Sequence, residues 1–192
     1  MSLFFDTPLI SGLAYREDAI TKAHEEKLIE HLASIDLSPF RFHGWLGNRK
    51  TKSFGWRYDF EDSSFTPTEA IPLWLEPLRE TAAVFAGLEP EDFVAVLLAR
   101  YDKGAGIGWH RDRDLFEQVV GISLASAAIL RFRRRRPVGF DRASLELFPR
   151  SAYLLSGPAR WEFEHSIAPG DELRFSITFR SLSEKGRLIA AK

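Results

Sequence analysis

The segment GIGWHRDRD, Gly106 to Asp114, places one histidine and two aspartates after a glycine-rich stretch. His110 and Asp112 are two residues apart, so on an extended backbone their side chains point the same way and reach one small cation. A neutral imidazole beside a carboxylate suits Fe(II), and also Zn(II) or Mn(II). The alternative is a solvated turn in which Asp114 and the neighbouring arginines form surface ion pairs.

His165 is the candidate third ligand. It lies in WEFEHSI, which we expect to form a strand with Trp161, Phe163 and His165 on one face. A histidine grouped with two aromatic residues is commonly a core residue. Together with His110 and Asp112, however, it completes a set of two histidines and one carboxylate. Such a set fills one face of an octahedral metal and leaves the opposite face open for a cosubstrate and dioxygen.

The segment LRFSITFRS places two arginines on one strand face. Arg174 and Arg180 alternate with apolar residues, so one face is polar and the other apolar. If the polar face is exposed, the arginines are ordinary surface charges. If it points inward, each guanidinium can bind a carboxylate through two parallel hydrogen bonds. Arg174 would then hold a distal carboxylate, and Arg180 would lie near the metal-proximal end or near Asp112.

The elements that must position these residues change in kind near residue 90. Before it, EDAITKAHEEKLIEHLASI and the segment from about Glu76 to Phe85 have helical spacing, and Gly87 is a stop signal. After it come short segments rich in β-branched and aromatic residues, separated by turns: FVAVLLARY, VVGISL, AAILRFRR, ASLELF, SAYLLSG, WEFEHSI and LRFSITFRS. Such a series predicts a sandwich, a barrel or a jelly roll.

Composition excludes several kinds of site. The 192 residues contain no cysteine, so a disulfide, a thiolate metal site and a cysteine nucleophile are excluded, and any metal must be held by Asp, Glu or the five histidines. No apolar run is long enough to cross a bilayer, and the first ten residues lack the features of a signal peptide. We therefore expect a cytoplasmic protein without a membrane partner, and we infer no obligate protein partner. The net charge of -1 gives no overall attraction to nucleic acid.

The segments ARYDKGAGIGWHRDRD, HSI and RFSITFR occur in that order, and together they resemble the motifs of the AlkB family of Fe(II)- and 2-oxoglutarate-dependent dioxygenases. The similarity covers about residues 42–182. It implies Fe(II) as cofactor, 2-oxoglutarate and O2 as cosubstrates, and His110, Asp112 and His165 as the iron ligands and catalytic residues.

The resemblance also assigns the other site residues. Arg174 would bind the far carboxylate of 2-oxoglutarate, helped by the phenol of Tyr101, and Arg180 would complete the anionic end. Asp114 matches a position that contacts the target base. One departure is Ala99, where the family usually has asparagine, and the lost neutral hydrogen bond should weaken cosubstrate binding by roughly 1 kcal/mol.

The implied fold is mainly β within the α+β class: a double-stranded β-helix, or jelly-roll, core with the N-terminal helices packed on one sheet. We expect one catalytic domain over residues 1–192. Residues 1–90 would supply the helices and a substrate-recognition lid at about 42–60, and residues 91–183 the double-stranded β-helix core.

The expected lid contains NRKTKSFGWRYDF, in which basic and aromatic residues alternate. Phe54, Trp56, Arg57 and Tyr58 are the candidate substrate-binding residues, since unstacked bases bind to aromatic side chains with basic residues nearby. The alternative is an amphipathic hairpin packed over the barrel. The run RFRRRR, residues 131–136, would grip a nucleic-acid backbone or form a solvated hairpin tip.

These features predict oxidative demethylation of N-alkylated nucleobases, with alkylated DNA or RNA as the substrate and formaldehyde as a product, as in AlkB-like alkylation repair. One alternative keeps this chemistry but acts on a protein side chain or a small molecule. Another is a catalytically silent binding module on the same fold, which only the replacement at Ala99 favours.

Overall fold

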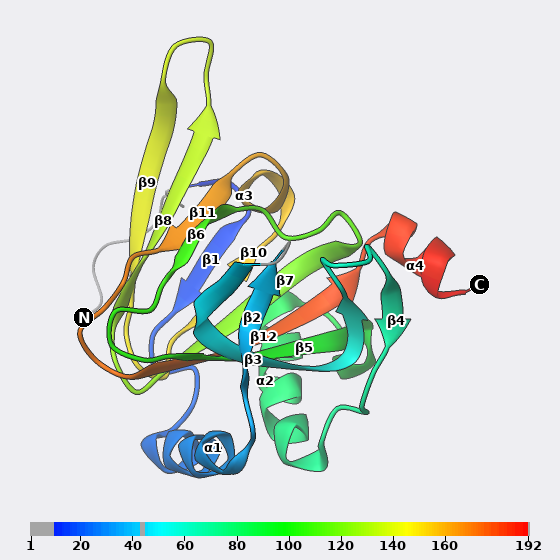
Figure 1. Ribbon diagram of the computed structural model, residues 1–192, viewed down its shortest axis with the longest axis vertical. Helices are drawn as coiled ribbons and strands as arrows, with labels where there is room; N and C mark the ends of the chain where they lie inside the picture. Colours follow the sequence, from blue (N-terminus) through cyan, green and yellow to red (C-terminus); the bar gives the residue numbers. More distant parts are fainter. Residues whose placement is uncertain (1–9, 43–44, 192) are drawn as a thin grey trace.

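The computed structural model describes residues 10–42 and 45–191, which form two antiparallel β-sheets and the helices around them (Figure 1). The larger sheet has the order β1-β10-β7-β12-β5-β3-β2, and β4 pairs with β3. The smaller sheet has the order β6-β11-β8-β9. The larger sheet comprises β1 (Leu13–Arg16), β2 (Ser38–Phe42), β3 (Trp45–Tyr58), β4 (Phe65–Pro67), β5 (Phe93–Tyr101), β7 (Phe116–Leu124), β10 (Ala152–Leu155) and β12 (Arg174–Leu182). The smaller comprises β6 (Ile107–His110), β8 (Ala128–Arg135), β9 (Phe140–Leu147) and β11 (Glu164–Ile167).

Two amphipathic helices cover one face of the larger sheet, α1 (Lys22–Ser34) and α2 (Glu76–Ala86). The first begins after Thr21, whose side chain accepts a hydrogen bond from a main-chain amide of the first turn. The second ends at Gly87, which adopts a left-handed φ of 68° that glycine tolerates without strain. Both boundaries follow from the helix signals in the sequence.

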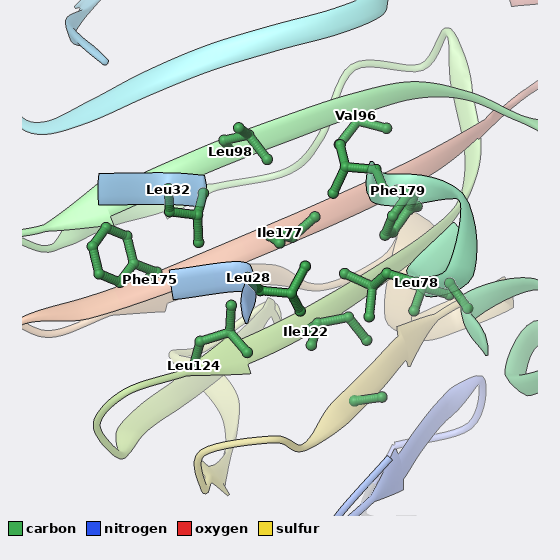
Figure 2. Packing of buried hydrophobic residues seen from close by; sticks show 14 of the residues in the cluster. Leu28, Leu32, Leu78, Val96, Leu98, Ile122, Leu124, Phe175, Ile177 and Phe179 are labelled. Carbon is green, nitrogen blue, oxygen red and sulfur yellow. The ribbon is translucent and has the colours of Figure 1, made fainter. Parts of the chain in front are cut away.

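The core lies between these helices and the sheet. Leu28 and Leu32 of α1 and Leu78 of α2 pack on Ile177 and Phe179 of β12 and on their neighbours (Figure 2). Each of these side chains is at most 1% exposed, and burial of one such side chain stabilises the fold by about 1.5–3 kcal/mol. This packing fixes β12 with its apolar face toward the helices.

The opposite face of β12 is therefore directed into the protein rather than into solvent. Arg174, Ser176 and Thr178 are all buried despite being polar. A second apolar cluster joins β7 and β10 of the larger sheet to β8 and β11 of the smaller one, and includes Phe132 and Tyr153. The inward orientation considered for the two arginines is the one that the fold adopts.

The mainly-β architecture with helices on one sheet is confirmed. The two antiparallel sheets are consistent with a double-stranded β-helix, although the described residues do not close into a barrel. None of the helices found in the described ranges is long and apolar enough to span a bilayer.

Two expected elements differ from the structure. WEFEHSI is not a strand throughout, because Trp161 ends the short helix α3 (Gly157–Trp161) and β11 begins only at Glu164. Residues 42–60 do form a hairpin with β2, but β3 is a strand of the larger sheet and pairs with β5 from Lys50 to Gly55. The segment is thus part of the sheet rather than a separate layer over it. The helix α4 (Glu184–Ala190), next to β4, lies beyond the elements expected from the sequence.

Candidate active site

Two neighbouring strands of the smaller sheet bring the three candidate ligands together. The register of β6 and β11 places His110 directly opposite His165, and Asp112 follows two residues after β6 ends. The imidazole ring centres are 4.3 Å apart, and a ligand atom from each of the three residues lies within 4.8 Å of the others. The pairing of β6 with β11 thus brings together two histidines that are 55 residues apart in the sequence.

The His110 ring is oriented by its own backbone. Its Nδ1 lies 2.8 Å from the carbonyl oxygen of Gly108, which makes Nδ1–H the donor and leaves Nε2 free to bind a cation. That Nε2 is 3.8 Å from Oδ1 of Asp112. A main-chain contact therefore selects the tautomer that a metal site requires.

A residue of the larger sheet, Arg180, holds the carboxylate of Asp112 in place. Nε of Arg180 on β12 donates to Oδ2 of Asp112 at 2.7 Å, and the Asp112 side chain is only 7% exposed. Burial raises the pKa of this carboxyl, but Arg180 and the two imidazoles outweigh it and hold the pKa well below its ordinary value. The carboxylate is ionised, and its Oδ1 faces the histidines.

Both histidines are neutral around pH 7. Burial lowers the pKa of His165 to about 3, and His110 adds to this effect. Burial likewise lowers the pKa of His110, against the opposing influence of Asp112. A metal ligand must be unprotonated, so both imidazoles are ready to bind without losing a proton.

Arg174 is a buried arginine whose two terminal nitrogens are unpaired within the part of the chain that the structure describes. It is 3% exposed, its Nε donates to Ser123 at 3.1 Å, and its guanidinium carbon lies 5.0 Å from the Tyr101 ring centre. Neither Nη atom has a hydrogen-bond partner among the described residues. Two parallel unpaired N–H groups on a buried cation match the two oxygens of a carboxylate.

A third arginine, Arg49 on β3, lies beside the same phenol. It is 8% exposed and is hydrogen-bonded to Tyr101. Burial raises the pKa of Tyr101, but the charges of Arg49 and Arg174 outweigh it and lower the pKa overall. Ala99, on the same face of β5 as Tyr101, is itself buried and packs against it. The guanidinium of Arg49 therefore lies close to Ala99, the position where the resemblance predicts an asparagine side chain.

A cavity of about 660 Å³ opens beside the candidate ligands. Its lining includes His110, Asp112 and Arg180 together with aromatic side chains of β3 and of the segment after it. These aromatic residues are Trp56, Tyr58 and Phe60. The size and the mixture of flat apolar walls with a few polar groups are those of a small-molecule or nucleobase site.

The segment after Asp112 is held in place by Arg160 of α3. This arginine is 2% exposed, and its Nη2 donates to the main-chain oxygens of Arg113 and Phe116. Burial lowers its pKa. Arg160 thereby fixes the backbone that carries Asp112 and Arg113 toward the cavity.

The proposed substrate residues fall into two groups. Trp56, Arg57 and Tyr58 line the cavity, whereas Phe54 is 4% exposed and belongs to the core under the helices. Phe54 therefore faces the core rather than the cavity. Gly55 has a φ of 73°, and β3 exchanges β5 for β4 as its partner at this residue, so the alternation of side chains is interrupted.

Asp114 also departs from its expected role. Its carboxylate accepts from Nζ of Lys185 on α4 at 2.7 Å, its side chain is 58% exposed, and it is not among the cavity-lining residues. The residue that faces the cavity at this point is its neighbour Arg113. In this structure Asp114 is therefore turned away from the cavity, and its contact with a target base stays a prediction.

The arginine run 131–136 lies on β8 and at the tip of the projecting β8–β9 hairpin (Figure 1). Arg133 pairs with Glu164, and Arg134 pairs with both Asp141 and Glu162. Arg136 also pairs with Asp141. These contacts favour a structural role for much of the run, in keeping with the solvated-hairpin alternative.

To the residues that the sequence pattern indicates, namely the three ligand candidates, Arg174 and Tyr101, the structure adds Arg49, Arg113 and Arg160. Nothing in their local sequence separates them from surface arginines, because each acts across a non-local contact. Burial distinguishes Arg49 and Arg160, and contact with the aromatic rings distinguishes Arg113.

The residues present fit Fe(II) and 2-oxoglutarate. Two neutral imidazoles and one ionised carboxylate are the donor set of oxygenases that keep coordination positions open. The unpaired Nη atoms of buried Arg174 supply the complementary site for a distal carboxylate.

Comparison with known proteins agrees with this chemistry. Residues 17–180 match the family model of the 2OG-Fe(II) oxygenase superfamily. The chain is 30% identical to "Alpha-ketoglutarate-dependent dioxygenase AlkB" of Salmonella typhimurium, over 74% of this chain and 68% of that protein. It is 26% identical to "Alkylated DNA repair protein ALKBH8 homolog" of Arabidopsis thaliana, over 82% of this chain and 51% of that protein.

The fold is shared with a solved structure titled "The structure of OsALKBH1". The TM-score is 0.69 at 16% sequence identity, covering 91% of this chain and 100% of the other. The chain is thus a member of the 2OG-Fe(II) oxygenase superfamily, an enzyme family that uses Fe(II), 2-oxoglutarate and O2, and within it belongs with the AlkB-like proteins.

Proposed function

We propose that this protein is an oxidative demethylase of N-alkylated nucleobases in DNA or RNA, built on a double-stranded β-helix. The observation that carries the proposal is the cavity beside His110 and Asp112, with Trp56, Tyr58 and Phe60 in its lining. Flat aromatic side chains bind a base that has been turned out of its stack. The name of the Arabidopsis relative, an alkylated DNA repair protein, supports the same substrate class.

In this proposal His110, Asp112 and His165 hold the iron. Fe(II), when bound with its cosubstrates, supplies the oxidation of a nearby C–H bond, and a hydroxylated N-methyl group leaves as formaldehyde. The protein contributes orientation. Gly108 selects the Nε2 face of His110, and Arg180 fixes one carboxylate oxygen of Asp112.

Arg174, which would hold the cosubstrate, is not among the described lining residues of the cavity proposed for the base. Arg174 would bind the distal carboxylate through its two unpaired Nη atoms, and Tyr101 and Arg49 lie beside this arginine. Arg49 adds a buried positive charge where the amide expected at Ala99 is absent. Buried donors in a medium of low dielectric constant bind a carboxylate more strongly than the same groups at the surface.

Formaldehyde release from a panel of methylated DNA and RNA oligonucleotides tests the proposal. We expect release that depends on Fe(II), 2-oxoglutarate and O2, and binding that weakens steeply with added salt. The Asp112→Ala variant serves as the inactive control. Consumption of 2-oxoglutarate without formaldehyde from any DNA or RNA substrate would contradict the proposal.

A further inference from the structure

The cavity beside the candidate iron site has a strongly positive lining. Among its described lining residues the only carboxylate is Asp112, and Arg180 already neutralises it at 2.7 Å. The arginines in the lining are Arg49, Arg57, Arg111, Arg113 and Arg180. Arg57 is paired with Asp59 at 2.8 Å. Binding of Fe(II) together with doubly charged 2-oxoglutarate adds no net charge, so the loaded cavity also repels cations.

Arg113 occupies the aromatic wall on which a base would lie. Its guanidinium carbon is 4.3 Å from the Tyr58 ring centre and 5.0 Å from the Phe60 ring centre. An open cluster of aromatic rings attracts cations, but here a protein cation already faces two of these rings. A methylated base with a fixed positive charge would meet Arg113 instead of a free ring face.

Arg113 also has unused hydrogen-bonding capacity. Its Nε is buried and has no partner among the described residues. Arginine only donates, so it can recognise a carbonyl oxygen but not an amino group. Asp114, the carboxylate next to Arg113 in the sequence, is turned outward to Lys185.

We propose, on the basis of the proposed function, that Arg113 selects neutral N-methylated bases that present a carbonyl oxygen in place of an exocyclic amino group, and disfavours methylated bases that are cationic at neutral pH. The substrate class is that of 3-methyluracil and 3-methylthymine rather than 3-methylcytosine. 3-Methyluracil and 3-methylcytosine have the same pyrimidine ring and are methylated at the same nitrogen. They differ at one exocyclic group, oxygen against amino nitrogen, and in charge.

The test uses two oligonucleotides of one sequence, with a single 3-methyluracil or 3-methylcytosine at the same position. With the iron-loaded enzyme we expect kcat/KM for formaldehyde release to be at least about tenfold higher for 3-methyluracil. Fluorescence anisotropy without oxygen should show the same order of affinities. Arg113→Gln should reduce the ratio to about threefold or less, and Arg113→Glu should favour 3-methylcytosine.

Folding of the variants is separable from selectivity. Arg160 bonds to the main-chain oxygen of residue 113, so a change of the side chain leaves that contact available. Lys27→Gln, the same loss of charge at an exposed position of α1, should keep the wild-type ratio. Unchanged thermal midpoints and 2-oxoglutarate affinity would show that the Arg113 variants fold correctly.

Equal or faster turnover of 3-methylcytosine would overturn this inference and leave the proposed function intact. A wild-type ratio in Arg113→Gln would overturn the role of Arg113. Absence of formaldehyde from both oligonucleotides and from the wider methylated panel, with 2-oxoglutarate still consumed, would overturn the proposed function as well.

Discussion

Replacement of Arg174 by methionine should separate cosubstrate binding from folding. The two unpaired Nη groups of this buried arginine are the proposed donors to the distal carboxylate. A hydrogen bond to a charged group contributes about 1.5–3 kcal/mol, so losing two of them at the lower value removes about 3 kcal/mol. That loss corresponds to roughly a hundredfold weaker binding of 2-oxoglutarate.

The unliganded protein should tolerate the change. Within the described residues, the only hydrogen bond of the Arg174 side chain is the one from Nε to Ser123. Methionine keeps the apolar stem and removes a buried cation, so we expect the free energy of unfolding to change by no more than about 1 kcal/mol. Arg174→Lys should bind at an intermediate level because an ammonium lacks the planar fork.

Titration of 2-oxoglutarate into the anaerobic Fe(II) protein, followed by its visible absorbance, measures the dissociation constant. Thermal unfolding without ligand measures the stability. The matched control is Arg142→Met, the same substitution at an exposed position of β9. A dissociation constant for Arg174→Met within threefold of the wild-type value would refute the assignment of this arginine to the cosubstrate.

Further predictions concern the groups around the iron site. Asp112→Ala should abolish formaldehyde release and lower the free energy of unfolding by about 3 kcal/mol, because Arg180 loses its buried partner. Asp114→Ala, which breaks an exposed ion pair, should change stability by less than about 1 kcal/mol in the same denaturant titration. The pKa of His165 is about 3 in the folded protein, against 6.5 for an unperturbed histidine, so between these values the unfolded chain binds a proton that the folded protein does not. Metal-free protein should therefore lose stability as pH falls below about 6.5, by about 1 kcal/mol per pH unit; a flat stability profile from pH 7 to 5 would contradict this. Arg49→Met should weaken 2-oxoglutarate binding by about tenfold with little effect on iron affinity, and isothermal titration with each ligand distinguishes the two.

The features that the sequence predicts well depend on local periodicity. Alternation along β12 places Arg174 and Arg180 on one face, and burial of Ile177 by the helices then directs that face inward. Asp112 lies beyond the end of β6, and its Oδ1 still comes within 3.8 Å of Nε2 of His110. The inference for the two arginines succeeds because a strand of nine residues leaves little freedom in where its side chains point.

The features that it misses depend on distant pairings or on broken alternation. Arg49 reaches Tyr101 because β3 pairs with β5, with Lys50 opposite Arg100, and no local pattern encodes that register. A side chain at Gly55 would meet the carbonyl oxygen of Val94 at 2.0 Å, so glycine is required there. Its positive φ then separates Phe54 from the cavity.

A break in the strand also explains the outward position of Asp114. Residues 111–113 follow the end of β6 and do not continue the strand, so the two-residue spacing from Asp112 no longer fixes a common face. Lys185 then captures the carboxylate from α4, a helix that the sequence pattern did not predict. A motif match fixes residue types, but the main chain after the strand decides which of them enters the cavity.

The central claim is that His110, Asp112 and His165 hold one iron ion whose open face accepts 2-oxoglutarate. Visible absorption of the anaerobic protein after stepwise addition of Fe(II) and 2-oxoglutarate tests it most directly. We expect a weak charge-transfer band that needs both additions, saturates at one iron per chain and is absent in His165→Ala. A folded wild-type protein without the band, or the same band in His165→Ala, would contradict the account.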